Sequence, residues 1–217
     1  MCGSSDRLTQ FCQTLSGLLH LRMIDCQSFL GKVFIVQRKP TPEEIRAAIG
    51  NTVPDILAPD LQVLFCGINP SLYSAAVGHH FARPGNRFWP TLHGAGFTQR
   101  LLTPFEDGDL VQFGYGLTNI VDRATARADE LDPEELVTGH QQLAAKVQHY
   151  RSRFLAVLGI GAYRTAFNRP KAVMGKQDES VHGAIVWVLP NPSGLNAHYQ
   201  LEDLKRVYRE LLVATKT

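Results

Sequence analysis

Short, mostly apolar runs alternate along the chain with longer segments in which apolar residues recur every three or four positions. A short run bounded by glycine, proline or polar residues predicts a buried strand, because a strand covered on both faces carries apolar side chains at successive positions. The strands predicted in this way are residues 61–66, residues 116–121, Phe154–Leu158 and Ala184–Leu189.

Capping residues mark where helices begin between these strands. Thr41 and Asp132 are each followed by a proline and, three residues on, by a glutamate, which is the pattern of a capped helix start. The last predicted helix carries Leu204, Val207 and Leu211 along one face. The predicted helices are residues 41–48, 86–95, 132–150, 198–214 and a segment that runs from the glycine turn at 159–161 to residue 167.

Alternating strands and helices are typical of a parallel sheet with helices on both faces. We therefore expect an α/β fold, a three-layer α/β/α sandwich around a central four-stranded, mainly parallel sheet. The pattern assigns residues 40–217 to a single domain. Residues 1–39 contain three of the four cysteines and only weak periodicity, which favours a poorly ordered N-terminal extension.

Composition narrows the class of protein. No run approaches the ~18 consecutive apolar residues of a membrane span, so we expect no membrane-spanning segment. Four cysteines without a C-x-x-C pair indicate neither a disulfide scaffold nor a cysteine-bound cluster, and favour a reducing, cytoplasmic location, associated with the nucleoid if the source is bacterial. His79 and His80 have no acid or cysteine near them in sequence, so we expect no metal.

The distribution of charge is more informative than its sum. The net charge is only +2, but residues 61–105, 136–177 and 180–201 contain no Asp or Glu. Acid-free stretches of this kind favour a polyanionic partner such as DNA. They are equally typical of ordinary solvated faces, so charge alone leaves the partner open.

Two loops that follow predicted strands carry the candidate chemistry. Ligands of parallel sheets bind beyond the carboxyl ends of the strands. The loop after the first strand begins Gly67-Ile68-Asn69-Pro70, and the loop after the fourth begins Pro190-Asn191-Pro192. An Asn-Pro pair fixes a turn and sets the direction of the Asn side chain, and a single such pair is usually an ordinary turn. Two at the ends of strands in one sheet indicate a site.

Four motifs, taken in order, resemble one family. They are Gly-Ile-Asn-Pro after the first strand, His-Phe-Ala-x-Pro-x-Asn-Arg-Phe-Trp at residues 80–89, the segment at residues 116–125, and Leu-Pro-Asn-Pro-Ser-Gly-Leu at residues 189–195. Together they resemble the mismatch-specific uracil/thymine-DNA glycosylases of the uracil-DNA glycosylase superfamily. The resemblance runs from about residue 55 to the C-terminus.

The resemblance implies a monofunctional DNA glycosylase that excises uracil, and with it thymine or other damaged pyrimidines, opposite guanine. Its partner would be double-stranded DNA with one mismatched or damaged pyrimidine, flipped out before its glycosidic bond is hydrolysed. The resemblance also implies a monomer without a cofactor. A DNA mismatch-binding module with little turnover stays open as an alternative, as does a nucleotide-binding protein that uses the turn at Gly159.

The same resemblance assigns roles to residues. Asn69 would position the water, Phe81 would stack on the flipped base, and Leu195 would enter the vacated space in the duplex. Alternatively, Leu195 holds the last helix to the core. The remaining implied base-pocket residues are Gly67, Ile68, Ser74, Asn119 and Asn191, and the implied contacts to the opposite base are Ser193, Gly194 and Asn196.

Asn69 and Asn191 stand where faster members of the superfamily have an aspartate and a histidine. An amide has no useful pKa, so Asn69 can orient water but cannot act as a general base. We therefore expect a slow enzyme that acts where flipping is easy and the leaving group is good, which fits uracil opposite guanine. Ser71, the Asn196-Ala197 pair and the His79-His80 pair depart from the family pattern.

Overall fold

The structure is a computed structural model that describes residues 38–217. The predicted N-terminal extension, residues 1–39, lies outside the described residues except for its last two positions. The described chain begins with the short helix α2 (Pro42–Ala47), which has the capping box predicted from Thr41 and Glu44. Among the described residues, no helix is both long and apolar enough to cross a lipid bilayer.

The central sheet has five strands, so the prediction of four strands was wrong by one. The strand order is β2 (Tyr115–Asn119), β1 (Val63–Gly67), β3 (Phe154–Leu158), β5 (Ala184–Leu189), β4 (Gly175–Val181). The first four are parallel, and β4 pairs antiparallel with β5 at the sheet edge.

Strand β4 lacks the apolar run by which the other strands were recognised. Its sequence is Gly-Lys-Gln-Asp-Glu-Ser-Val, and only Val181 is buried. An edge strand with one solvated face needs few apolar residues, and charged side chains protect its free edge from pairing with other chains. A tight turn joins it to β5, in which His182 and Gly183 both have positive φ values, 45° and 90°.

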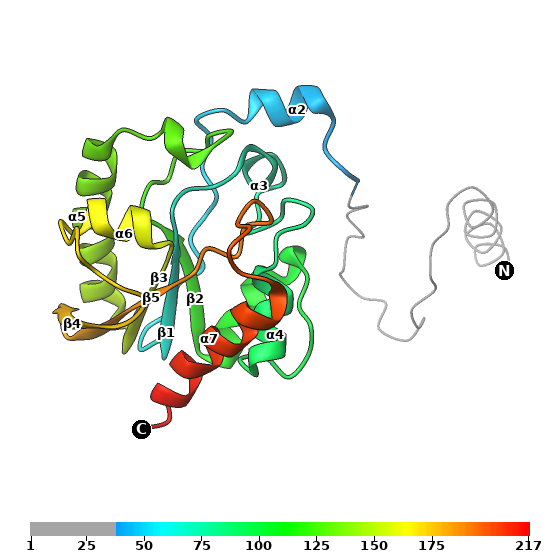
Figure 1. Ribbon diagram of the computed structural model, residues 1–217. Coiled ribbons are helices and arrows are strands. Elements are labelled where there is room, and N and C mark those ends of the chain that lie inside the picture. The colour runs from blue at the N-terminus through cyan, green and yellow to red at the C-terminus, as the bar shows by residue number, and fades with distance from the viewer. Residues whose placement is uncertain (1–37) are drawn as a thin grey trace, which may run out of the picture. The chain divides into compact units, whose positions relative to one another are not determined.

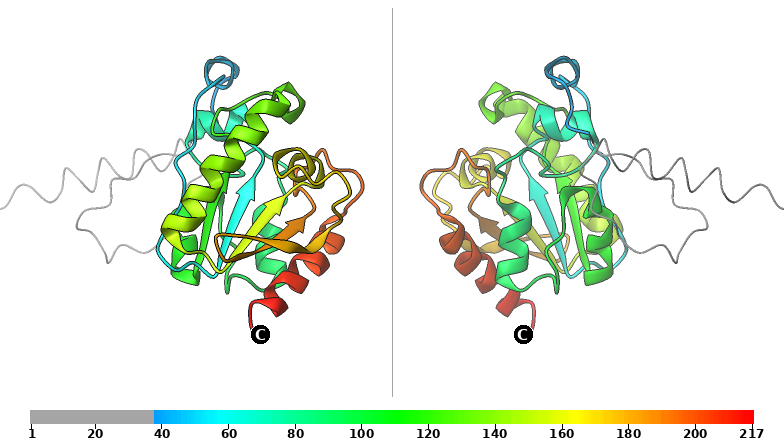
Figure 2. Two further views of the ribbon diagram at one scale, coloured as in Figure 1. Left: turned by 90° about the vertical axis from the view of Figure 1, so that its left-hand side faces the viewer. Right: turned by 90° about the vertical axis from the view of Figure 1, so that its right-hand side faces the viewer.

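Helices cover both faces of the sheet, which confirms the three-layer α/β/α sandwich (Figures 1 and 2). Helices α4 (Phe88–Ala95) and α7 (Leu201–Ala214) pack on one face, over Phe65 and its neighbours. Helices α5 (Pro133–Tyr150) and α6 (Ile160–Ala166) pack on the other, over Leu64 and Cys66. Successive residues of β1 therefore belong to opposite halves of the core, which is why the whole run is apolar.

Three short elements, α3, η1 and η2, were not predicted. Helix α3 (Leu72–Val77) follows β1 and begins at Ser71, whose hydroxyl accepts a hydrogen bond from the Ser74 backbone N–H. A kinked 3₁₀ segment, η1 (Pro104–Phe113), precedes β2, and a single 3₁₀ turn, η2 (Ala128–Glu130), precedes α5. These elements are short, and helical periodicity is weak over so few residues.

The order in which the chain adds strands to the sheet reverses direction at β1. From β1 the chain passes to β2 on one side and then returns to β3 on the other. The connecting loops therefore diverge at the carboxyl end of β1, and a ligand crevice is expected at such a point. This arrangement places the loops after β1, β2, β3 and β5 at one edge of the sheet.

Gly139 determines how closely α5 approaches the segment that follows β2. A Cβ atom at Gly139 would lie 2.1 Å from the backbone oxygen of Ile120, whereas a Cβ at Gly161 in α6 would meet nothing within 4 Å. We expect Gly139→Ala to lower the free energy of unfolding by roughly 1–3 kcal/mol, because backbone must move apart. Gly161→Ala is the matched control and should raise it by about 0.4–1 kcal/mol. Urea denaturation measures both, and equal effects of the two substitutions would contradict the packing argument.

Candidate active site

A cleft of about 330 Å³ opens at the carboxyl edge of the sheet. It is lined by the loops after β1, β2 and β5 and by the end of β3, so it lies at the point where the winding reverses. The structure brings together nearly every residue that the sequence singled out. Those that line the cleft are Gly67, Ile68, Asn69, Ser74, Phe81, Asn119, Asn191, Ser193, Leu195 and Asn196; Gly194 does not.

The Asn69 side chain has a fixed orientation. Its Nδ2 donates to the backbone oxygen of Arg123 at 3.1 Å and to Oγ1 of Thr125 at 2.7 Å. The Thr125 hydroxyl donates its own hydrogen to the Arg127 oxygen at 2.7 Å, so it must accept from Asn69. Both N–H groups of Asn69 are therefore used, and Oδ1 has no partner among residues 38–217. The amide presents an acceptor oxygen to the cleft.

An ion pair holds the backbone that orients Asn69. The Arg123 guanidinium binds the Glu135 carboxylate at the start of α5 through two N–H···O contacts, of 2.5 and 2.7 Å. This pairing, together with the capping hydrogen bond from Asp132, lowers the pKa of Glu135 to about 2. The Glu135 carboxylate therefore stays ionised, and able to pair with Arg123, at mildly acidic pH.

Asn191 has the opposite orientation. Its Oδ1 accepts a hydrogen bond from the backbone N–H of Ser193 at 2.9 Å, as in an Asx turn. A backbone N–H is only a donor, so the atom facing it must be the amide oxygen. Within the described part of the chain no group accepts from Nδ2 of Asn191, which leaves its N–H donors to the cleft.

Asn119 is a third amide in the cleft, at the end of β2. It is 5% exposed, and its side chain makes no hydrogen bond to any described residue. A Cβ atom at Gly67 would lie 2.5 Å from its Oδ1, so the glycine provides the space that this side chain occupies. Because Asn119 lines the cleft and its amide is not among the fully buried unpaired groups, its polar atoms can pair with water or with a ligand there.

Phe81 presents a ring beside these amides. It stacks on Phe88 with ring centroids 4.0 Å apart and an interplanar angle of 20°. Its φ value of 53° lies in the left-handed region, which is uncommon for a bulky residue and is often found at functional sites. The backbone N–H groups of Phe81 and Ile68 donate to no acceptor among the described residues. Both therefore remain available as donors at the cleft.

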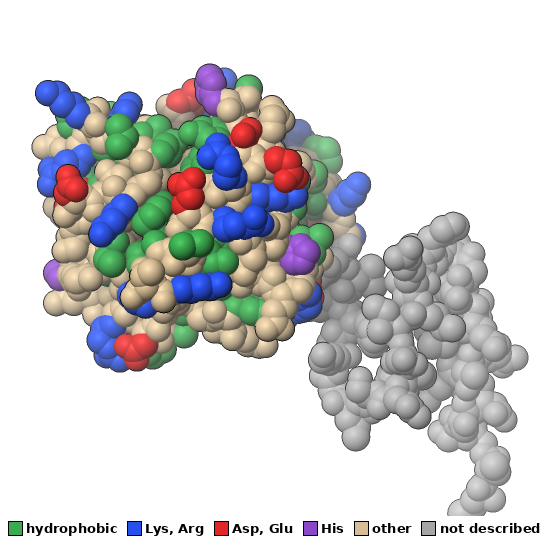
Figure 3. Space-filling view, turned by 60° about the horizontal axis from the view of Figure 1, so that its bottom comes forward, with side chains coloured by type: hydrophobic (Ala, Val, Ile, Leu, Met, Phe, Trp, Pro, Cys, Tyr) green, Lys and Arg blue, Asp and Glu red, His purple; other side chains and the backbone are tan. Residues whose placement is uncertain are grey.

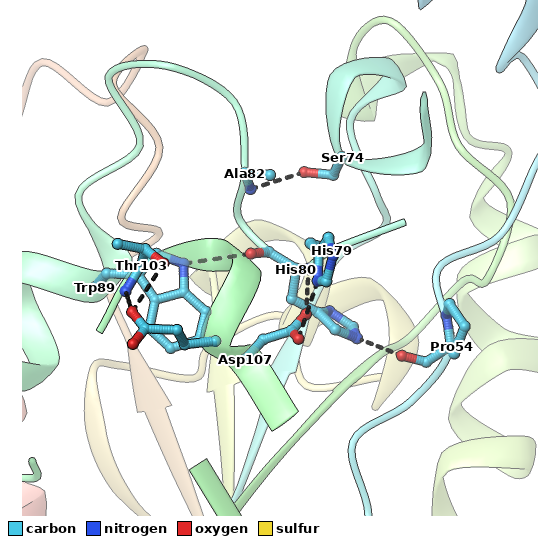
Figure 4. Close-up of polar contacts among 9 residues, drawn as sticks. Pro54, Ser74, His79, His80, Ala82, Trp89, Thr103 and Asp107 are labelled. Atoms are coloured by element: carbon cyan, nitrogen blue, oxygen red, sulfur yellow. Dashed lines mark hydrogen bonds and ion pairs between the residues drawn. The ribbon is translucent and has the colours of Figure 1, made fainter. Parts of the chain in front are cut away.

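Asp107 holds the loop that carries Phe81, and the sequence analysis missed it (Figure 4). This carboxylate is 5% exposed and comes from η1. Its Oδ2 accepts from the His80 backbone N–H at 3.0 Å, and its Oδ1 lies 3.1 Å from Nδ1 of His79. In the sequence, Asp107 is one acid in a cluster that resembles a solvated face, and η1 was not predicted.

The His79-His80 pair serves the same loop. Burial lowers the pKa of His80, which favours its neutral form. Its Nε2 lies 2.9 Å from the Pro54 oxygen, an acceptor, so Nε2 carries the proton. Ser74 also supports this loop, because its hydroxyl accepts from the Ala82 backbone N–H at 3.1 Å. Within residues 38–217, no three His, Cys, Asp or Glu side chains form a group able to hold a metal ion.

The loop after β5 projects Leu195 into solvent. The side chain is 73% exposed, which contradicts the alternative in which it holds the last helix to the core. Asn196 uses its polar groups within the loop: Nδ2 donates to the Asn191 oxygen, Oδ1 accepts from His198 N–H, and its own N–H donates to the Ser193 oxygen. The N–H and oxygen of Gly194 have no partner in the described chain.

Most basic residues of the acid-free stretch 136–177 have structural partners. Lys146 lies 2.7 Å from Asp55 and 3.3 Å from Asp122, Arg151 pairs with Asp60, and Arg169 pairs with Glu179. Basic side chains are scattered over the face shown in Figure 3 rather than gathered in one stripe. At the rim of the cleft, by contrast, the Arg83 side chain is exposed and makes no hydrogen bond or ion pair with any described residue.

Comparisons with known proteins identify the family and agree with the fold. The family model described as the uracil DNA glycosylase superfamily matches residues 54–212, which span every strand and all the cleft residues except Val53. A solution NMR structure of a candidate uracil DNA glycosylase from Methanosarcina acetivorans is similar, with a TM-score of 0.51 and 19% sequence identity. The similarity covers 76% of this chain and 99% of that one, and it supports the fold. The chain therefore belongs to the uracil DNA glycosylase superfamily.

Proposed function

We propose that this protein is a monofunctional DNA glycosylase that excises uracil, and also thymine or other damaged pyrimidines, from mismatches with guanine. Membership of the superfamily supports the glycosylase chemistry. The observation that carries the proposal is the opposite orientation of two amides in one cleft. Asn69 offers an oxygen to a water molecule, and Asn191 offers N–H donors to a base.

Hydrolysis needs a water molecule next to the sugar. The water oxygen bonds to the sugar carbon as the bond to the base breaks, and the base departs with negative charge that a proton then neutralises. Oδ1 of Asn69 can accept a hydrogen bond from this water and orient it. Because an amide cannot remove the proton, the rate lacks the contribution of a general base, roughly 10²–10⁴-fold.

The departing base needs hydrogen-bond donors. Nδ2 of Asn191 is unpaired at the cleft wall, and a fixed donor to a developing anion contributes roughly 10²–10³-fold. The unpaired N–H groups of Ile68 and Phe81 can bind a pyrimidine carbonyl, and the buried amide of Asn119 can pair with the base edge. One face of the Phe81 ring rests on Phe88, which leaves the other for stacking on the base.

Slow chemistry favours a base that leaves the duplex easily. Flipping costs a few kcal/mol and less at a mismatch, so a site without a general base depends on weak pairing and a good leaving group. Uracil opposite guanine meets both conditions. Leu195 would fill the space that the base vacates, as apolar wedges do in other DNA complexes. Gly194, with its free backbone groups, is better suited than Asn196 to contact the unpaired guanine.

Asn69→Ala is the first test. Labelled duplexes with one G·U or A·U pair, and a single strand with one uracil, are incubated with enzyme in excess and then treated with alkali. We expect strand breakage by the wild type, strongest for G·U, and an excision rate lower by about 10²-fold or more in the variant, since the water is no longer oriented. Asn51→Ala, an exposed asparagine outside the cleft, is the control.

Full activity of Asn69→Ala would contradict the role of the water-positioning amide. DNA that is retarded in a gel but never converted to abasic sites, even by the wild type, would indicate a mismatch-binding module instead.

Asp107→Ala should weaken the loop that presents Phe81. The substitution leaves the buried His80 N–H without an acceptor, a cost of about 1–3 kcal/mol in the free energy of unfolding. We expect excision of uracil to fall with it, by about tenfold, because the ring shifts relative to the base. Asp107→Asn keeps an acceptor oxygen and should recover most of the rate. Asp109→Ala, an exposed acid that pairs with Arg100, is the matched control. Equal rates for Asp107→Ala and Asp109→Ala would argue against this role.

Arg83→Ala should reduce DNA affinity without changing its selectivity. An unpaired guanidinium at the cleft rim is suited to a phosphate contact, which is independent of sequence. We expect the affinities for G·U and for undamaged duplex to fall by the same factor, and the slope of log affinity against log salt concentration to decrease by about 1. Arg151→Ala removes an arginine that Asp60 already pairs with and should leave the slope unchanged. A change in slope with Arg151→Ala but none with Arg83→Ala would refute this assignment.

A further inference from the structure

The Arg87 side chain reaches from the start of α4 to the loop after β5. Its Nη1 donates to the Tyr199 oxygen at 2.5 Å, and its Nη2 donates to the Ser193 oxygen at 2.5 Å and to the Asn196 oxygen at 2.9 Å. Its Nε lies 3.4 Å from the Pro192 oxygen. The Arg87 backbone N–H donates to that same oxygen at 3.0 Å. One guanidinium therefore binds carbonyls spread over the whole loop at residues 192–199.

These contacts replace regular secondary structure. The loop belongs to no helix or strand, so its carbonyl groups have few backbone donors of their own. A guanidinium carries five N–H donors in a rigid plane, and several carbonyls can bind it at once in one arrangement. In the described part of the chain Arg87 has no carboxylate partner, so these carbonyls are what its charge interacts with. We expect lysine, which has a single point of charge, to bind only some of them.

The segment that carries Arg87 also supports the Phe81 ring. Phe88, the next residue, stacks on Phe81. Gly85, two residues before Arg87, packs against the tip of the loop at residues 192–199. A Cβ atom at Gly194 would lie 2.8 Å from the Gly85 oxygen. Residues 85–88 therefore contact both the stacking ring and the loop that bears Leu195. The position of the Phe81 ring is therefore fixed relative to the loop that bears Leu195.

We propose that Arg87 is a positioning residue that holds Leu195 in the orientation needed to enter the duplex. The inference rests on the proposed function, in which Leu195 fills the space left by the flipped base. An exposed side chain on an irregular loop gains little orientation from packing, so its position depends on the hydrogen bonds of the loop backbone. Arg87 acts through those carbonyls and does not itself contact the base.

The loop has a second attachment that does not involve Arg87. The hydroxyl of Tyr208 donates to the Pro190 oxygen at 3.0 Å, at the start of the loop. We therefore expect Arg87→Lys to fold and to keep the loop attached while its tip becomes less ordered. Arg87→Gln, which keeps one N–H donor group, serves as a second variant.

The experiment compares affinities for two duplexes, one with a tetrahydrofuran abasic analogue opposite guanine and one undamaged. The affinity for the abasic duplex divided by the affinity for the undamaged duplex reports whether Leu195 fills the gap. A general loss of folding lowers both affinities together and leaves this ratio unchanged. The variants are Arg87→Lys, Arg87→Gln, Leu195→Ala and the double variant Arg87→Lys with Leu195→Ala. Arg209→Lys is the matched control, because Arg209 also donates to backbone carbonyls, those of Gly94 and Ala95, away from the cleft.

We expect Arg87→Lys, Arg87→Gln and Leu195→Ala each to lower the ratio by about tenfold. The double variant should lower it no further, because Arg87 acts only through Leu195 and the two effects are then not additive. Arg209→Lys should leave the ratio unchanged. An unchanged ratio in both Arg87 variants, equal loss of affinity for both duplexes, or a double variant whose losses multiply would overturn the role of Arg87. An unchanged ratio in Leu195→Ala would instead overturn the wedge itself, and with it that part of the proposed function.

Discussion

Backbone pairing of β1 with β2 on one side and with β3 on the other is the constraint on which the cleft depends. The register sets Gly67 beside Asn119, and because Gly67 has no side chain, the amide of Asn119 can lie over it. A shift of register by one residue would turn every side chain of a strand to the opposite face. Val63 and Phe65 pack in one half of the core and Leu64 and Cys66 in the other, so such a shift would exchange side chains of different size and disturb the packing on both faces of the sheet.

Three amides, those of Asn69, Asn119 and Asn191, line the cleft, and under the proposed function they take roles for which an ionisable side chain is more usual. Two of them, Asn69 and Asn191, are oriented by hydrogen bonds whose direction admits one assignment, since a carbonyl only accepts and a backbone N–H only donates. The acceptor of Asn69 and the donors of Asn191 therefore face the cleft without any dependence on protonation. Under the proposed function, the site relies on positioning and on fixed dipoles, with no carboxylate among the described side chains that line the cleft.

Much of this arrangement is predictable from the sequence. Capping boxes and apolar runs located the parallel strands and the long helices to within a few residues, and the Asn-Pro loops indicated the cleft. Strand β4 was not predicted, because an edge strand needs no apolar run. The structural roles of Asp107 and Arg87 were not predicted for a different reason. Their partners are backbone groups distant in the chain, and a backbone N–H or carbonyl has the same appearance in every sequence.

Among the described residues no carboxylate pairs with the Arg87 guanidinium, because carbonyl dipoles satisfy its donors and leave its full charge in place. This positive charge therefore lies behind the loop at residues 192–199, which under the proposed function meets the duplex. Such a field attracts the phosphate backbone over a distance set by ionic strength, about 8–10 Å under ordinary conditions. Under the proposed function, a polar contact within the protein would thus also contribute to the electrostatic steering of DNA toward the cleft.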